Sequence, residues 1–436
     1  MIELKTCPIC NSSAWKNLDY LRDHQYWYDK DLRDIDEPVG MKICLECGFV
    51  TYDYIELDKL QAHYDRERPV MNAGNITTCN RKNQYHKAFI GDILAKLDES
   101  ANILDVGCAQ GSFLNMLKSE YGFMNVSGTE WSKAFANFGK YEYGLNITQE
   151  IDLAKKYDLI SYYHVLEHVQ WPDKELSKIR DILTDDGYLY IAVPLYLEQL
   201  EESSGSLTTD FENLYHLNHV NVFSKQALKN LLLKFGFSII KENDTLYGYA
   251  VLCKNGLFQN LEFIKEDAAA VDYKLLCHQK ACAALSDYIR TQNATMIDEA
   301  LTHVKDYPDA YVMKSLTKDN MKDFAAQKQI LLDGLKACPD NIRIKTQLGK
   351  LYFQWDENTP GKQFYSNNIK AAEKLFYEVL EHKPGHEDIF YFLSIIESRY
   401  KGNKLKAVDY MKKCIEINPM KFAECYNLIA QYYKEI

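Results

Sequence analysis

Glycines, small residues and two carboxylates are spaced along residues 103–131 in a way that would suit a nucleotide-like cofactor. Glycines at the turn after an apolar run let the backbone bend sharply and let a ligand approach its amides, and the helix expected from Gly111 points its positive end at the same place. About 20 residues further on, Glu130 is placed to accept hydrogen bonds from ribose hydroxyls. The predicted cofactor-binding residues are Asp105, Gly107, Cys108, Ala109, Gly111, Glu130, Trp131 and His164.

The elements that must position these residues alternate between strand and helix. Apolar runs predict strands at 103–106, 126–130, 157–164 and 188–194, with a helix that ends at 185–187. From about 75 to 255 the chain resembles the class I S-adenosylmethionine-dependent methyltransferases. The resemblance implies an α/β fold with a Rossmann-like seven-stranded methyltransferase sheet. Ala109 stands where this family often has a glycine, and alanine is small enough that we expect no lost binding.

Two Cys-x-x-Cys pairs near the N-terminus could hold a metal. Cys7, Cys10, Cys44 and Cys47 supply four thiolates, which suits a closed tetrahedral zinc site of the structural kind. The 33 residues between the pairs exceed the usual spacing of about 15 to 20. Redox thiols are the alternative, but neither pair opens a thioredoxin-like pattern. The segment resembles the zinc-binding module of a group of sugar-modifying methyltransferases.

Histidines are the candidates for removing a proton from an acceptor, because their charge changes near neutral pH. Residues 219–224 resemble the stretch of sugar methyltransferases in which a histidine acts as base, so His219 is the predicted catalytic base, with His164 and His216 as further candidates. Asn218 replaces the glutamate that precedes this histidine in deoxysugar C-methyltransferases, which favours O- or N-methylation. His168 is interpreted as structural, and a purely structural His219 is the alternative.

Residues from 256 onward carry helical patterns with a period near 35, the length of a tetratricopeptide repeat. Pro339, Pro384 and Pro419 each close a predicted helix. From about 295 the chain resembles a short tetratricopeptide array, which would bind a protein partner or an extended ligand on a concave face. An ordinary helical bundle is the alternative. The predicted domains are 1–70 (zinc-binding), 71–255 (methyltransferase) and 256–436 (helical).

Composition narrows the function further. The formal net charge of −11 argues against a nucleic-acid partner, although a local basic patch stays open. No apolar run is long enough to span a membrane and the N-terminus does not have the form of a signal peptide, which predicts a cytoplasmic location. In that reducing compartment we expect the twelve cysteines to be free thiols or metal ligands. The preferred hypothesis is methyl transfer from S-adenosylmethionine to a sugar of a nucleotide-linked or surface glycan. An RNA methyltransferase and a tetratricopeptide adaptor with an inactive methyltransferase domain are the alternatives.

Overall fold

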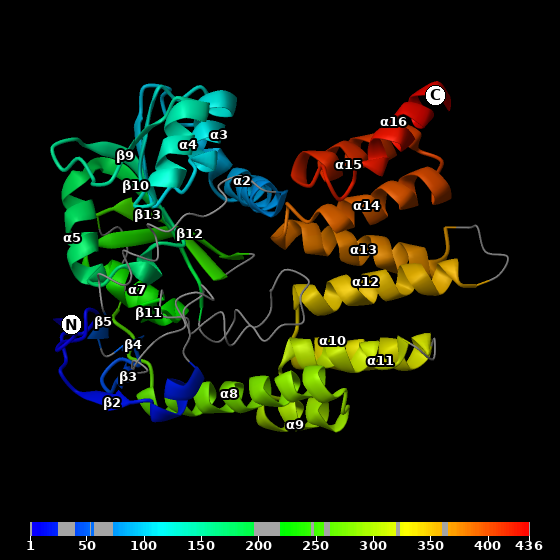
Figure 1. Cartoon of the computed structure of the whole chain (residues 1–436), viewed down its shortest axis with the longest axis horizontal. Coiled ribbons are helices and arrows are strands. Elements are labelled where there is room, and N and C mark those ends of the chain that lie inside the picture. The colour runs from blue at the N-terminus through cyan, green and yellow to red at the C-terminus, as the bar shows by residue number, and fades with distance from the viewer. Residues whose placement is uncertain are drawn as a thin grey trace. The chain divides into compact units, whose positions relative to one another are not determined.

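A computed structural model describes residues 2–24, 40–52, 54–55, 73–195, 219–245, 248–256, 262–319, 323–359 and 365–435 (Figure 1). The chain forms two compact units. The first comprises residues 1–70 and 90–283, and the second comprises 71–89 and 284–436. The predicted boundaries at 70 and 255 separate segments that we expect to fold independently. This division stays a prediction. Among the described residues, no helix combines the length and apolar character needed to cross a bilayer.

The described residues of the first unit form a seven-stranded, mixed sheet. The resemblance to the methyltransferases implied such a sheet. Its order is β12-β13-β10-β9-β6-β7-β8. The strands are β6 (Asn102–Val106), β7 (Asn125–Thr129), β8 (Asn146–Thr148), β9 (Tyr157–Tyr163), β10 (Leu183–Val193), β12 (Phe237–Thr245) and β13 (Gly248–Asn255). β6 pairs in parallel with β7 and β9, and β13 runs antiparallel to β10 and β12. The predicted α/β fold class is confirmed.

Helices connect the strands and bury their apolar sides on the sheet. They are α3 (Ser112–Tyr121), α4 (Lys133–Tyr143), α5 (Pro172–Ile182) and α7 (Lys225–Lys234), with a short 3-10 helix η3 (Leu166–His168) before α5. The Ser224 hydroxyl accepts a hydrogen bond from the Ala227 amide and caps α7 as its sequence position predicts. The prediction that the helix before β10 reaches 185–187 was wrong: α5 ends at Ile182, and β10 begins with the next residue.

A four-stranded sheet beside the cysteine pairs combines three N-terminal strands with one strand from much later in the chain. Its order is β11-β4-β3-β2, from β2 (Trp15–Asn17), β3 (Met41–Cys44), β4 (Val50–Tyr52) and β11 (Asn221–Val222). A two-residue pair, β1 (Ile2–Glu3) with β5 (Tyr54–Ile55), lies outside this sheet. Cys7, Cys44 and Phe49 share one hydrophobic core with sheet residues such as Ile160 and Ile191. The N-terminal segment that carries the cysteine pairs, which we call the N-terminal module, therefore shares one hydrophobic core with the seven-stranded sheet.

The second unit is all-helical over its described residues. It contains α9 (Thr295–His303), α10 (Pro308–Leu316), α11 (Phe324–Ala337), α12 (Ile342–Glu357), α13 (Asn367–His382), α14 (Glu387–Ile395), η6 (Ile396–Tyr400), α15 (Lys404–Ile417) and α16 (Glu424–Glu435). Two long helices, α2 (Ala73–Leu94) and α8 (Ala268–Thr291), each contribute residues to both units.

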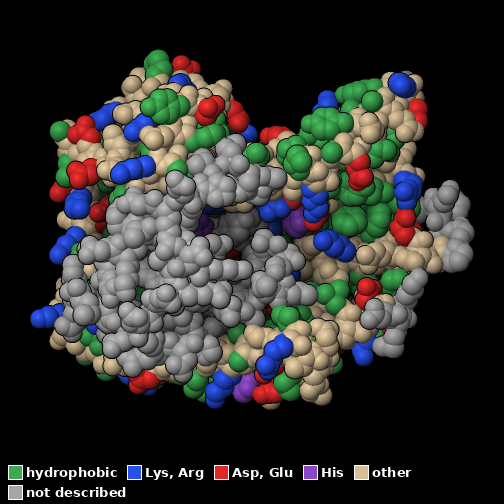
Figure 2. Space-filling view, in the orientation of Figure 1, with side chains coloured by type: hydrophobic (Ala, Val, Ile, Leu, Met, Phe, Trp, Pro, Cys, Tyr) green, Lys and Arg blue, Asp and Glu red, His purple; other side chains and the backbone are tan. Residues whose placement is uncertain are grey.

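Three helices of the helical unit end where the prolines predict. α11, α13 and α15 end just before Pro339, Pro384 and Pro419. At Gly349 in α12, a Cβ would lie 2.6 Å from Cε1 of Phe376 in α13, so the absence of a side chain here permits close packing of these two helices. Figure 2 shows hydrophobic side chains gathered over the C-terminal helices, where Leu405 and Tyr426 are exposed.

Candidate functional site

The turn after β6 has the backbone geometry that its glycines predict. Gly107 and Gly111 have φ angles of 67° and 79°, and a Cβ on Gly107 would lie 2.5 Å from Cγ2 of Val165. Ala109 also takes a left-handed conformation, with φ 49°. An L-residue pays about 1–2 kcal/mol for this conformation. Alanine at position 109 therefore makes the left-handed turn less favourable than glycine would. The surrounding structure must hold the turn in place.

Glu130 provides that support from the end of β7. Its Oε2 accepts a hydrogen bond from the Ala109 amide at 2.9 Å, and its Oε1 accepts one from the Ser132 amide at 2.7 Å. The residue is 9% exposed, and burial raises the pKa of its carboxyl while these amide hydrogen bonds oppose the rise. Each carboxylate oxygen has a second lone pair, so both can still accept from a ligand. The next residue, Trp131, is 43% exposed at the same strand end.

Two other predicted cofactor residues are buried beneath the turn. Asp105 accepts a hydrogen bond from the Ser161 hydroxyl at 2.6 Å, which joins β6 to β9. The Cys108 thiol packs over Gly128, where a Cβ would lie 2.6 Å from its Sγ. Burial raises the pKa of the Cys108 thiol well above its ordinary value, which disfavours the reactive thiolate. The backbone amide of Cys108 donates a hydrogen bond to the Thr129 carbonyl at 2.9 Å and so ties the turn to β7.

Three imidazoles surround one buried carboxylate beside this turn. Glu167 in η3 is completely buried. Its Oε1 lies 3.5 Å from Nδ1 of His164, 3.7 Å from Nε2 of His168 and 4.0 Å from Nε2 of His219. The rings of His168 and His219 lie 4.9 Å apart. We call Glu167, His164, His168 and His219 the histidine cluster.

The structure brings together residues that sequence reasoning treated one by one. The predicted candidates His164 and His219 both belong to the histidine cluster, and His216 lies outside the described residues. His164 follows β9 with a strained φ of 58°. Glu167 was missed as the centre of the site. The only local signal was its place between two histidines in the sequence 164–168.

The N-terminal module positions His219. The carbonyl of Val220, the residue after His219, accepts two hydrogen bonds from this module. The donors are the Thr51 hydroxyl at 3.0 Å and the Tyr52 amide at 3.2 Å. The buried Asn221 side chain donates to the Val169 carbonyl at 2.6 Å, just beyond η3. The segment is thus fixed to β4 on one side and to η3 on the other. Sequence reasoning missed the roles of Thr51 and Asn221.

The four predicted zinc ligands converge as predicted. Sγ of Cys7 lies 3.6 Å from Sγ of Cys47, and Sγ of Cys10 lies 3.5 Å from Sγ of Cys44. All four sulfur atoms lie within 4.8 Å of one another. Thiolates bound to one zinc ion at about 2.3 Å in tetrahedral geometry have separations of this size. The donor set therefore fits zinc.

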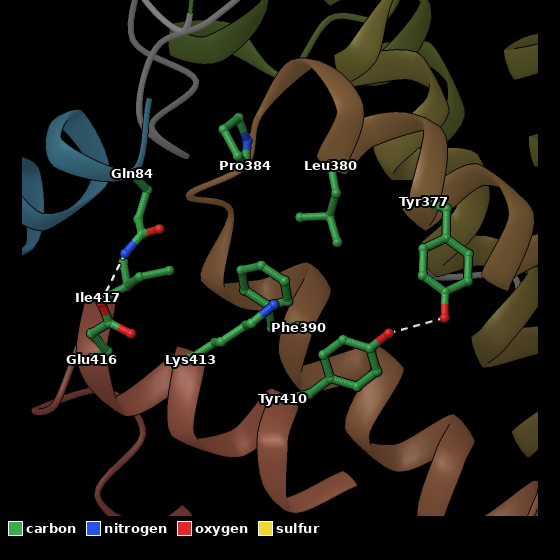
Figure 3. Close-up of a pocket in the computed structure, with 9 residues that line it drawn as sticks. All are labelled: Gln84, Tyr377, Leu380, Pro384, Phe390, Tyr410, Lys413, Glu416 and Ile417. Carbon is green, nitrogen blue, oxygen red and sulfur yellow. Dashed lines mark hydrogen bonds between the residues drawn. The ribbon is translucent and has the colours of Figure 1, made fainter. Parts of the chain in front are cut away.

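The second unit contains a separate pocket of about 330 Å³ (Figure 3). The hydroxyls of Tyr377 and Tyr410 lie 3.0 Å apart at one side, and the Gln84 amide donates to Glu416 at 2.8 Å. The lining also includes Leu380, Pro384, Phe390, Lys413 and Ile417. None of these residues belongs to the cofactor turn or the histidine cluster. The pocket is a feature of the helical unit.

Comparison with known families agrees with this division. Residues 80–242 match the family model described as a methyltransferase domain, and residues 390–419 match that of a tetratricopeptide repeat. The chain thus carries a segment that matches methyltransferase domains, followed by one helical hairpin that matches a tetratricopeptide repeat. The repeat match covers α14 and α15, the hairpin that ends before Pro419.

Individual relatives are distant. The (S)-tetrahydroprotoberberine N-methyltransferase of Eschscholzia californica is 26% identical over 107 residues, which are 22% of this chain and 31% of that enzyme. The chain thus spans about a third of this curated relative. Among solved structures, the plantazolicin methyltransferase BpumL in complex with SAH is 17% identical, with a TM-score of 0.31 over 45% of this chain and 90% of that one. The magnesium protoporphyrin IX methyltransferase of Synechocystis PCC 6803 with bound SAH is 16% identical, with a TM-score of 0.33 over 45% of this chain and 92% of that one.

Proposed function

We propose that this protein transfers a methyl group from S-adenosylmethionine to a hydroxyl oxygen on a sugar of a nucleotide-linked or surface glycan. The observation that carries the proposal is the meeting of two features at one sheet edge. β6 and β9 are parallel neighbours, so the turn held by Glu130 and the histidine cluster both follow carboxyl ends of adjacent strands. Ligands of open α/β sheets bind at this edge.

The turn and the histidine cluster have separate tasks in this reaction. The turn amides and Glu130 would hold the cofactor, with Trp131 beside its nucleoside. A lone pair of the acceptor oxygen forms the new bond to the methyl carbon as the carbon–sulfur bond breaks, and the bonding electrons stay on sulfur. The acceptor must also lose its proton, which a sugar hydroxyl releases slowly without help. We propose that proton removal depends on His219, with His164 as the second candidate.

The N-terminal module would serve this site indirectly. We propose that Cys7, Cys10, Cys44 and Cys47 hold one structural zinc ion. Cys44 ends β3, β3 pairs with β4, and β4 pairs with β11 next to His219. A zinc ion at the cysteines would therefore stabilise the sheet that positions His219, without taking part in the chemistry.

The proposal is tested by incubating the purified chain with S-adenosylmethionine labelled in its methyl group and fractionated cell extract. We expect label in a sugar-containing small-molecule or glycan fraction, and none with Glu130→Ala. Label in RNA would overturn the proposal in favour of the RNA methyltransferase. Cofactor binding without label in any fraction would favour the adaptor. Label on a nitrogen atom would correct the acceptor, and the curated relative is named as an N-methyltransferase.

The tetratricopeptide match supports a protein partner for the helical unit, because stacked repeats of this kind present extended binding surfaces. The net charge of −11 disfavours nucleic acid as that partner. The cytoplasmic location inferred from the sequence stays a prediction.

A further inference from the structure

We propose that Glu167, His168 and His219 bind one divalent transition-metal ion, distinct from the zinc proposed at the cysteines. Binding of the ion rests on the geometry of these three residues alone. Only its part in methyl transfer rests on the proposed function. The proposal gives His219 the role of a metal ligand, through which proton removal would depend on it.

The distances within the site suit a shared ion. One ligand atom from each of the three residues lies within 4.8 Å of the other two. The separations of Glu167 Oε1 from the two Nε2 atoms, 3.7 and 4.0 Å, are too long for hydrogen bonds. Two ligands bound to one ion at about 2.0–2.2 Å each are separated by up to about twice that distance. The separations of Glu167 Oε1 from both Nε2 atoms fall within this limit, so the geometry brings all three residues near the distances that one shared ion requires.

The charge and rigidity of the site favour a cation. Glu167 is completely buried, and His168 and His219 are only 22% and 13% exposed in their side chains. A buried carboxylate is stabilised by a positive charge beside it. Glu167 and His168 are adjacent in η3, while His219 is held by the hydrogen bonds between β4 and residue 220. Ligands placed by two separately anchored elements are a preorganised site.

The donor set selects the kind of metal. Two imidazole nitrogens and one carboxylate oxygen suit Fe²⁺, Co²⁺, Ni²⁺ or Zn²⁺, whereas Mg²⁺ and Ca²⁺ prefer oxygen ligands. Three protein ligands leave a coordination position open. A hydroxyl oxygen that binds there has a lower pKa, and its proton would pass to water or to His164 before the oxygen attacks the methyl carbon.

Binding of Co²⁺ tests the proposal without any acceptor. The full chain, purified with zinc in its cysteine site, is dialysed against a mild chelator, and its zinc content is measured by elemental analysis. Co²⁺ is then added and followed by calorimetry and visible absorption. We expect about one equivalent to bind, with the weak bands of nitrogen and oxygen ligands and without the intense thiolate charge-transfer band that cobalt at the cysteines would give.

Three variants identify the ligands. Glu167→Gln, His168→Ala and His219→Ala should each weaken Co²⁺ binding at least about 100-fold, more than the loss of an outer-shell partner typically costs. His164→Ala is the matched control: its Nδ1 is 3.5 Å from the same Glu167 oxygen but is outside the ligand set, so this variant should bind Co²⁺ as the parent does. Melting temperature and zinc content must match the parent for each variant.

Two results would overturn the proposal. One is a parent protein that binds no Co²⁺ beyond its cysteine site. The other is unchanged Co²⁺ affinity in folded Glu167→Gln and His219→Ala. Methyl transfer that survives removal of this Co²⁺ would leave the proposed function standing and reject the catalytic part of the metal proposal. Metal binding without methyl transfer to any acceptor would do the reverse.

Discussion

Replacing Glu130, which holds the turn and is proposed to bind the cofactor, should weaken cofactor binding. In the proposed complex, each carboxylate oxygen uses one lone pair for the amide of Ala109 or Ser132 and the other for a ribose hydroxyl. A hydrogen bond to a charged group contributes about 1.5–3 kcal/mol. Glu130→Ala removes both ribose contacts, which together contribute about 3–6 kcal/mol to the binding free energy of the cofactor. The loss of one such bond already weakens binding about tenfold or more.

Calorimetry with S-adenosylhomocysteine measures this loss without an acceptor. Glu130→Gln retains one acceptor oxygen of similar shape, so its affinity should fall between those of the parent and Glu130→Ala. Glu150→Gln changes an exposed glutamate just beyond β8 and should bind as the parent does. Parent-like affinity in a folded Glu130→Ala would refute the assignment of this residue to the cofactor site.

The pH dependence of binding gives a second test of the same residue. Burial raises the pKa of Glu130 above its ordinary value of 4.5, so the carboxylate takes up a proton at a higher pH than an exposed glutamate would. The protonated form loses acceptor capacity. Cofactor affinity should therefore be level above this raised pKa and fall as the pH is lowered through it. Glu130→Gln cannot titrate and should lose this dependence, and an identical acid fall in both proteins would count against the argument.

Four further predictions concern the acceptor side, the cysteine site and the helical unit. His219→Ala should lower turnover by about 100- to 10,000-fold while cofactor affinity by calorimetry stays level; substantial remaining turnover would exclude a role in proton removal. Cys44→Ser should lose one zinc per chain by elemental analysis and lower the melting temperature, and a metal-free parent with an intact fold would contradict the zinc proposal. Thr51→Val removes the buried hydrogen bond to the Val220 carbonyl and should reduce turnover about tenfold or more with unchanged cofactor affinity, because small displacements of a reacting group are costly; equal turnover would show that β4 does not position His219. Arg81→Met leaves the buried Glu387 carboxylate without its paired guanidinium and should destabilise the helical unit by about 3–5 kcal/mol in urea unfolding, whereas an unchanged midpoint would show that the pair contributes nothing.

The sequence by itself determined the local features, such as turns and helix ends, that depend on residues close together in the chain. Glycines at 107 and 111 predict the left-handed turn because a side chain disfavours that backbone conformation, and the structure has both in it. Ser224 predicts the start of α7 because its hydroxyl reaches an amide three residues on. The two cysteine pairs predict a four-sulfur cluster because each pair places two thiols on one turn, and Pro339, Pro384 and Pro419 predict helix ends because proline cannot continue a helix.

Only the tertiary structure decided how distant segments share a site. Glu167 becomes the centre of the histidine cluster because β9 ends beside the segment that carries His219, about 50 residues later in the chain. That segment is fixed by β4, whose pairing with β11 joins residues 50–51 to residues 221–222. Strand pairing depends on long-range packing and register, which no local pattern encodes. The sequence therefore identified His164 and His219 as candidates, whereas the fold set the geometry that adds Glu167 and on which the proposed proton-removing and metal-binding roles depend.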